Sequence, residues 1–240
     1  MNLSLLLEMS ASTLEDRPAV TSGSRTLSYA QLDAAARRCA AKFLSMGATG
    51  VVYCGTNDAS FPIAVFGAAY AGLPFIPLNY RLGDEQLQPL VEANRGAVII
   101  AETARVPGAD PEKVVLRSTL LDAEFSTKAD IELPAFVDPE DVAIVLYTSG
   151  TSGTPKAALL RHRHLTAYVI GTVEFAGAEP EQAALVTVPP YHIAGLAAIL
   201  SSVYSGRRIV QLANFDPDEW IDLAISEEIT HAMVVPTMLS

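Results

Sequence analysis

The sequence predicts an α/β fold in which helices flank layered, mostly parallel sheets. Helical and strand-like segments alternate along almost the whole chain, and the strand-like segments are short uninterrupted apolar runs. Helical crossovers between strands impose parallel pairing, and continuous apolar strands are typical of sheets covered on both faces. With 240 residues, half of them hydrophobic and 18% charged, the chain can bury a substantial core.

The first half predicts a β-α-β-α-β order after two helices. The apolar start of the chain ends at Glu8 and lacks the basic residues of an export signal, so we interpret it as a surface helix. The uncharged run 60–78 is interrupted by prolines and Gly72 and therefore predicts a buried helix and strand instead of a membrane span. Asp84 is the expected N-cap of a later helix. The expected elements are helix 29–46, strand 51–54, helix 61–71, strand 75–78, helix 84–94 and strand 98–101.

The second half resumes the alternation after an irregular stretch. Residues 102–140 contain several prolines and predict a loop-rich connection with short strands, which could be a subdomain seam. The chain ends just after a buried-strand pattern, so we expect residues 1–240 to be part of a larger domain. The expected elements are strands 142–147 and 156–160, helix 165–175, strand 185–188, helix 195–204, strand 209–212, helix 217–226 and strand 232–235.

Charge and cysteine content exclude some classes of function. The formal net charge is -11, which does not fit the basic surface of a nucleic-acid-binding protein. An anionic substrate would need local positive charge or backbone N–H groups at its site. Only Cys39 and Cys54 occur, and both fall in core-like patterns. Two thiols without a signal peptide favour a reducing compartment, and we expect a cytoplasmic protein.

The most informative segment follows the apolar strand that begins at Val142. It reads Tyr-Thr-Ser-Gly-Thr-Ser-Gly-Thr-Pro-Lys over residues 147–156. Glycines let the backbone approach a ligand, successive N–H groups form an anion-binding nest, and hydroxyls add donors. The Pro155-Lys156-Ala157 ending does not fit the P-loop of nucleoside triphosphatases. We interpret the segment as a polyphosphate-binding loop formed by Thr148, Ser149, Gly150, Thr151, Ser152, Gly153, Thr154, Pro155 and Lys156.

This string resembles the phosphate-binding signature of the adenylate-forming superfamily. That superfamily includes acyl-CoA and aryl-CoA synthetases, luciferases and the adenylation domains of peptide synthetases. Its usual pattern is Tyr-Thr-Ser-Gly-Thr-Thr-Gly-x-Pro-Lys-Gly, from which Ser152 and Ala157 depart. Ser152 keeps the hydroxyl. Ala157 loses backbone freedom, which costs about 1 kcal/mol or more if that position needs a positive φ.

Further segments resemble the same superfamily. Residues 27–32 are similar to its early Leu-Thr-Tyr-x-x-Leu motif, and residues 69–79 to its Ala-Gly-x-x-x-x-Pro-Leu element. Residues 79–82 continue as Asn-Tyr-Arg-Leu, which is more typical of CoA ligases than of peptide synthetases. Residues 189–196 resemble the Pro-x-x-His-x-x-Gly motif of acyl- and aryl-CoA ligases. The resemblance implies that His192 orients or gates the acid between a carboxylate pocket and a CoA tunnel.

The residues around the His192 motif allow some further interpretation. Helix 195–204 is rich in small residues, which permit either a roomy acyl pocket or tight helix packing. Amino-acid-activating domains usually carry an aspartate near the His192 motif. None occurs here, which favours an acid without an α-amino group. The string 161–164 contains His-x-His, a spacing that can bind zinc, but no carboxylate or thiol partner is evident nearby, so we predict no protein metal site.

The resemblance implies two half-reactions. The first forms acyl-AMP and pyrophosphate from ATP and a carboxylic acid, either fatty or aryl, and the second forms a thioester with coenzyme A. ATP, Mg²⁺ and coenzyme A as co-substrate are therefore expected, with Lys156 and His192 as catalytic residues. The family's Tyr-Gly-x-Thr-Glu and Thr-Gly-Asp motifs and its late catalytic lysine do not occur, so we expect the chain to be inactive alone.

Two alternatives remain open at this point. The first is an adenylation domain that loads a carrier protein, which the identity of the thiol acceptor would distinguish. The second is a half-length protein that binds nucleotide or a partner without catalysis. Neither alternative involves nucleic acid or a transmembrane segment.

Overall fold

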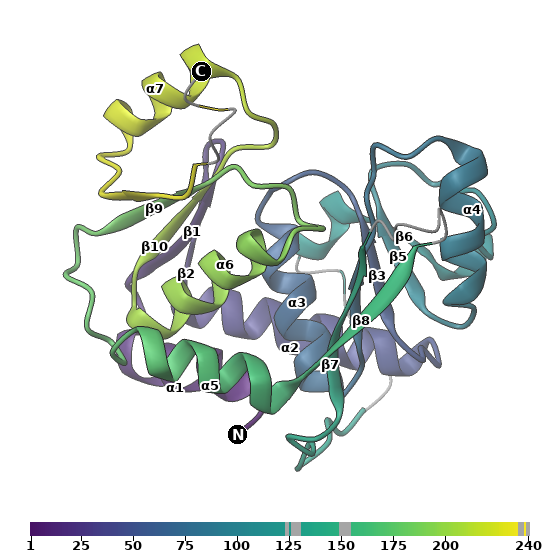
Figure 1. Cartoon of the computed structure of the whole chain (residues 1–240). Helices are drawn as coiled ribbons and strands as arrows, with labels where there is room; N and C mark the ends of the chain where they lie inside the picture. Colours follow the sequence, from purple (N-terminus) through teal and green to yellow (C-terminus); the bar gives the residue numbers. More distant parts are fainter. Residues whose placement is uncertain (123–124, 126–130, 149–154, 235–237, 239–240) are drawn as a thin grey trace.

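The computed structural model describes residues 1–122, 125, 131–148, 155–234 and 238, and in these residues the strands form two sheets (Figure 1). We call them sheet A and sheet B. In each sheet all neighbouring strands are parallel except for one pair at an edge, which is antiparallel: β1 (Pro18–Ser22) and β2 (Arg25–Ser28) in sheet A, and β7 (Val142–Thr148) and β8 (Lys156–Arg161) in sheet B. The predicted α/β class with mostly parallel layered sheets is therefore confirmed. Sheet A contains, in spatial order, β11 (His231–Ala232), β9 (Ala183–Val186), β10 (Arg208–Gln211), β1 (Pro18–Ser22) and β2 (Arg25–Ser28).

Sheet B is formed mainly by the middle of the chain. Its strands β3, β4 and β5 are the buried apolar runs expected from the sequence, and β7 and β8 form an antiparallel hairpin at its edge. The strands in spatial order are β6 (Val114–Leu116), β5 (Val98–Ala101), β3 (Val51–Cys54), β4 (Phe75–Pro77), β7 (Val142–Thr148) and β8 (Lys156–Arg161).

A layer of helices joins the two sheets (Figure 1). Helices α2 (Tyr29–Ser45), α3 (Ser60–Ala71) and α6 (Ile193–Ser205) lie between the sheets, and α1 (Ser4–Leu14) and α5 (His162–Thr172) pack against them at one end. The outer faces are covered separately. Helix α4 (Asp84–Ala93) covers sheet B, and α7 (Pro217–Ser226) covers sheet A.

The main core lies between the sheets and includes residues from both of them. Val20 of sheet A and Phe75 of sheet B belong to one continuous cluster of buried side chains. Every residue of α3 is buried within it, which explains why the uncharged run 60–78 has no polar face. In the described residues no helix combines the length and apolarity needed to cross a membrane.

Local signals explain where several helices begin. Ser28 caps α2, with Gln31 completing a reciprocal capping box. Asp216 caps α7 by accepting hydrogen bonds from the next two backbone N–H groups. The prediction that Asp84 is an N-cap is wrong: Gly83 holds that position and Asp84 is the first helical residue. Its carboxylate there still favours the helix through the helix dipole.

The structure differs from the expected elements in several places. Strand β9 lies two residues before the expected strand 185–188, and β11 spans His231–Ala232 where strand 232–235 was expected. The hairpin of β1 and β2 was not expected. Helix α5 starts at His162, about a turn before the expected helix 165–175. The described part of the stretch 102–140 contains one short strand, β6, in agreement with the expectation of short strands there, and also two short 3₁₀ helices that were not expected, Pro111–Lys113 and Arg117–Leu121.

Candidate functional site

The described residues of the predicted phosphate loop lie at the open end of the β7–β8 hairpin. Thr148 and Lys156 are cross-strand partners, and the Thr148 hydroxyl donates a hydrogen bond to the Lys156 carbonyl oxygen at 3.4 Å. Both residues and Pro155 are exposed. The antiparallel pairing therefore brings the two ends of the loop together beside the exposed side chain of Lys156. The remaining predicted loop residues, Ser149, Gly150, Thr151, Ser152, Gly153 and Thr154, lie outside the described residues.

Ala157 adopts an unstrained conformation. It lies within β8 and pairs with Tyr147 of β7. In the described part of the chain only Glu15, Ala176 and Glu228 have a positive φ among non-glycine residues. The substitution of alanine at this position therefore carries no left-handed backbone penalty.

The second predicted site residue, His192, is the N-cap residue of α6. Its backbone N–H donates to the Pro189 carbonyl at 3.0 Å, and its own carbonyl accepts from Gly195 at 3.0 Å. A Cβ atom on Gly195 would lie 3.1 Å from the Val188 carbonyl oxygen. Glycine at this position thus permits a tight turn, which leaves the His192 side chain exposed at the start of the helix.

One cavity brings these two predicted features together. It has a volume of about 400 Å³. Thr148 and Pro155 line it from the β7–β8 hairpin, and His192 lines it from the start of α6. Lys156 is next to this cavity in sequence but is not among its described lining residues. The remaining lining residues are mostly apolar: Pro77, Asn79, Leu82, Leu90, Leu146, Tyr147, Tyr191 and Ile193.

His192 also borders a second cavity, of about 500 Å³, on the side of sheet A. Arg81 contributes a positive charge to its wall, and Phe215 and Val188 contribute apolar surface. The hydroxyl of Thr187, another lining residue, is buried and has no hydrogen-bond partner in the described residues. His192 is therefore positioned where two ligand-sized cavities meet.

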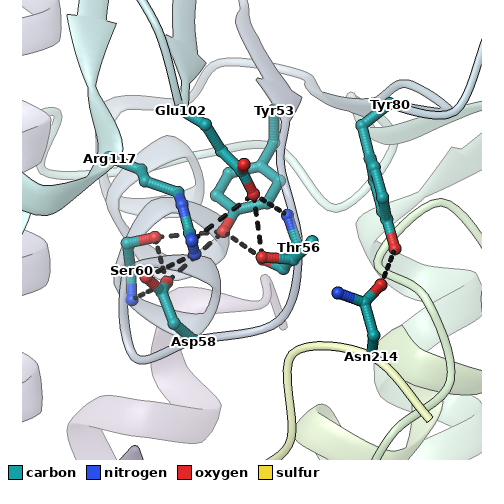
Figure 2. Close-up of polar contacts among 8 residues, drawn as sticks. All are labelled: Tyr53, Thr56, Asp58, Ser60, Tyr80, Glu102, Arg117 and Asn214. Carbon is teal, nitrogen blue, oxygen red and sulfur yellow. Dashed lines mark hydrogen bonds and ion pairs between the residues drawn. The ribbon is translucent and has the colours of Figure 1, made fainter. Parts of the chain in front are cut away.

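A polar bridge between the two sheets supports this junction, and sequence reasoning did not assign it. Figure 2 shows the Tyr80 hydroxyl pointing at the side chain of Asn214, to which it donates a hydrogen bond at 3.1 Å. Arg81 donates to the same Asn214 oxygen at 3.2 Å. The Tyr80 ring packs edge-on against Tyr191, and the Tyr191 ring contacts the His192 ring at a tilt, with ring centroids 4.6 Å apart. The string Asn-Tyr-Arg-Leu marked one side of this bridge, but no sequence signal marked Asn214.

A second polar cluster lies at the carboxyl ends of β3, β5 and β6 (Figure 2). Arg117 forms ion pairs with Asp58 at 2.5 Å and with Glu102 at 3.4 Å, and Glu102 also accepts hydrogen bonds from Thr56. Burial acts to raise the pKa of Glu102, but the bonds from Thr56 and the charge of Arg117 outweigh it and lower that pKa. Each charge in the cluster is paired, so we interpret it as a structural fastening of these strand ends.

The His-x-His string does not form a chelating pair. His162 is buried, and its Nδ1 accepts a hydrogen bond from the Leu3 backbone N–H at 3.1 Å. His164 is exposed, and its Nδ1 accepts from the Arg161 N–H at 3.3 Å. Within the described residues no group of three histidine, cysteine or acidic side chains is placed to hold a metal ion.

Comparison with known proteins decides the family. The sequence profile of the AMP-binding enzyme family matches residues 7–240. This chain is a member of the AMP-binding enzyme family. Among the relatives of this family member are a feruloyl-CoA synthase from an Amycolatopsis species, 30% identical over 92% of the chain, and the fatty acid–[acyl-carrier-protein] ligase ScoC of Streptomyces coeruleorubidus, 29% identical over 92% of it.

Solved structures agree with the fold of this family member. The o-succinylbenzoate–CoA synthetase of Bacillus subtilis in complex with AMP superposes with a TM-score of 0.82, at 22% identity over 98% of the chain. The same synthetase with ATP and a magnesium ion gives a TM-score of 0.79 at 21% identity. The chain spans about half the length of these relatives: 46% of the feruloyl-CoA synthase, 46% of ScoC and 49% of the AMP complex.

Proposed function

We propose that this chain supplies the phosphate-binding loop and the acid-binding histidine of an AMP-forming acid–CoA ligase. The observation that carries the proposal is the cavity of about 400 Å³ lined by both Thr148 and His192. The two residues come from different elements and from motifs 44 positions apart in the sequence (192 minus 148). A reaction between a polyphosphate and a carboxylate needs both anions held side by side, and a cavity bordered by both motifs supports that proposal.

The loop residues 148–156 would hold the β- and γ-phosphates of ATP. The Thr148 hydroxyl and the Lys156 ammonium group are exposed at the mouth of the hairpin, where they can donate to phosphate oxygens. A protein with a net charge of -11 repels anions on average, so a site for ATP must supply local positive charge and hydrogen-bond donors. Lys156 supplies the charge and Thr148 supplies a donor. We assign Lys156 to stabilising charge that develops as the α-phosphorus is attacked.

Mg²⁺ fits this arrangement without a protein cage. The described residues offer no cluster of three ligating side chains, and Mg²⁺ is commonly held by substrate phosphates, water and at most a few carboxylates. When bound to ATP it would neutralise phosphate charge. The AMP and ATP–magnesium complexes of the Bacillus synthetase support the assignment of these ligands to the family.

His192 would orient the acid and then face the incoming thiol. It borders both cavities, and the Tyr80–Asn214 bridge holds the neighbouring Tyr191 in place. We propose the cavity containing Arg81 as the approach of coenzyme A, an anionic thiol that a guanidinium group would attract. The two free, buried cysteines accord with the cytoplasmic location that we propose for this reaction.

The test is acid-dependent exchange of pyrophosphate into ATP. We expect an enzyme that contains these residues together with the other half of its relatives' length to catalyse this exchange with acids that lack an α-amino group. The 240-residue chain alone should show none. Exchange that is independent of any acid in the longer protein, or robust turnover by the chain alone, would contradict the proposal.

A carrier protein is the second candidate acceptor, because ScoC is an acyl-carrier-protein ligase by name. Supplying the acyl-adenylate with either coenzyme A or a phosphopantetheinylated carrier distinguishes the two. If the thioester forms faster on the carrier protein than on coenzyme A, the carrier protein is the acceptor and coenzyme A is not.

A further inference from the structure

A third cavity, of about 250 Å³, lies between α5, α6 and the strands β9 and β11 of sheet A. Its lining includes two basic side chains, Arg207 and His231, together with hydroxyl groups such as those of Thr172 and Ser201. The sequence motifs and the functional proposal above leave this cavity without a role.

Arg207 is incompletely partnered in this cavity. Its Nη2 donates to the Gln182 side chain at 3.3 Å, but its Nε is buried and has no hydrogen-bond partner in the described residues. No carboxylate in the described part of the chain forms an ion pair with it. Arg207 is half-buried at the wall of the cavity, and a guanidinium group without an ion-pair partner among the described residues can pair with a bound anion.

His231 is the second side chain of this cavity that can contact an anion, because an imidazole N–H group can donate a hydrogen bond. Burial and the charge of Arg207 both lower the pKa of His231. Burial likewise lowers the pKa of Arg207 itself. An anion bound between Arg207 and His231 would favour the charged form of each side chain.

Helix α6 runs from His192 to this cavity. Ile193 lines the cavities beside His192, whereas Ala197 and Ser201, one and two turns further along the helix, line the cavity with Arg207. The rise of an α-helix places Ser201 roughly 12 Å from Ile193. The opposite face, including Leu196 and Ile199, is buried in the core, so the small residues of α6 face the open side.

We propose that Arg207 and His231 bind the distal carboxylate of an extended acid whose reactive carboxyl group lies at His192. The substrate class is thus a dicarboxylic acid of medium chain length. Arginine pairs with carboxylates through two parallel hydrogen bonds, and the side of α6 that would face the methylene chain carries the small side chains of Ala197 and Ser201. The placement of the reactive carboxyl group rests on the function proposed above, whereas the anion site at Arg207 does not.

Calorimetric titration of the 240-residue chain with decanedioate and with decanoate tests the site directly. We expect decanedioate to bind about tenfold to a hundredfold more tightly, the range that a charge-assisted hydrogen bond provides, and Arg207→Gln to remove the difference. His231→Gln, on an exposed edge strand, should reduce it without threatening the fold. Equal affinity of the two acids in the wild type, no binding of decanedioate, or a preference that survives both substitutions would overturn the proposal.

Two further ligands separate a chain-spanning acid from a free anion. Butanedioate carries both charges but is too short to reach from His192, and inorganic phosphate has no chain at all. If either competes as well as decanedioate, the cavity binds a free anion and the substrate proposal is wrong. If Arg207-dependent binding is found but pyrophosphate exchange fails in the longer enzyme, the anion site stands and the ligase proposal fails.

Discussion

His162 is a buried histidine, and the folded state of the protein favours its neutral imidazole form. Its Nδ1 accepts a hydrogen bond from Leu3, so that nitrogen carries no proton. Burial lowers the pKa of His162 below its ordinary value of 6.5; the amino terminus acts in the same direction and Asp141 opposes it. The unfolded chain therefore takes up this proton more readily than the folded chain. The stabilising contribution is complete above the unfolded pKa and is lost as pH falls below about 6.5.

We accordingly predict that His162→Gln makes stability less dependent on pH. The wild type should lose more free energy of unfolding between about pH 7 and about pH 5 than the variant does, as measured by urea denaturation at both pH values. His164→Gln changes an exposed histidine of the same helix and serves as the control. Identical pH slopes for the wild type and His162→Gln would contradict the assignment.

The two cysteines are predicted to be unreactive in the folded protein. Burial raises the pKa of Cys39 to about 12 and that of Cys54 to about 11, the latter with help from Glu102. Because the thiolate is the nucleophile, a thiol-specific reagent at mildly alkaline pH should label neither residue until denaturant is added. Rapid labelling of Cys39 in the native protein, detected by mass spectrometry, would show that the α2–α3 interface opens readily.

At the scale of elements, the contact between α2 and α3 depends on Gly67. A Cβ atom there would lie 3.1 Å from the Cβ of Cys39 and 3.2 Å from both the Ala36 carbonyl oxygen and the Phe43 ring. Two of these neighbours are backbone or near-backbone atoms of α2, which cannot move without shifting the helix. Gly67 thus sets the close approach of two helices in the central layer.

Gly67→Ala should therefore destabilise the protein by about 1–3 kcal/mol, the usual cost of overpacking. Gly171→Ala is the matched control, since Gly171 is also helical but a Cβ atom added there would have nothing within 4 Å. There, alanine should stabilise by about 0.5–1 kcal/mol because of its better helix propensity. Chemical denaturation of the two variants measures both effects, and equal responses would mean that the α2–α3 contact is not close-packed.

Most elements were predictable because their sequence signals are local. Buried runs such as 51–54 and helix 217–226 were predicted with the observed bounds, since apolar runs, caps and glycine stops mark them. The strand Pro18–Ser22 was missed. Its place in the sheet depends on parallel pairing with β10, for example Val20 with Ile209, and no local pattern reports a partner so distant in the sequence.

At the scale of the whole molecule, the sequence indicated the two motifs but not that they lie close together in the folded chain. The hydroxyl- and glycine-rich string and the His192 motif were recognisable individually, and the fold places Thr148 and Pro155 of the first and His192 of the second around one cavity. The bridge from Tyr80 to Asn214 spans 134 positions in the sequence and links elements of different sheets. Such a contact is fixed by how the sheets pack on their shared helical layer, which periodicity cannot reveal.

The central claim is that the hairpin and His192 act on ATP and an acid at one site. The most direct measurement is the rate of acid-dependent pyrophosphate exchange in the longer enzyme carrying Lys156→Ala, with Lys42→Ala in the last turn of α2 as the control. We predict a loss on the order of a hundredfold for Lys156→Ala, the scale of one transition-state contact, and little change for the control. An exchange rate unchanged by Lys156→Ala would contradict the phosphate-binding role of the loop.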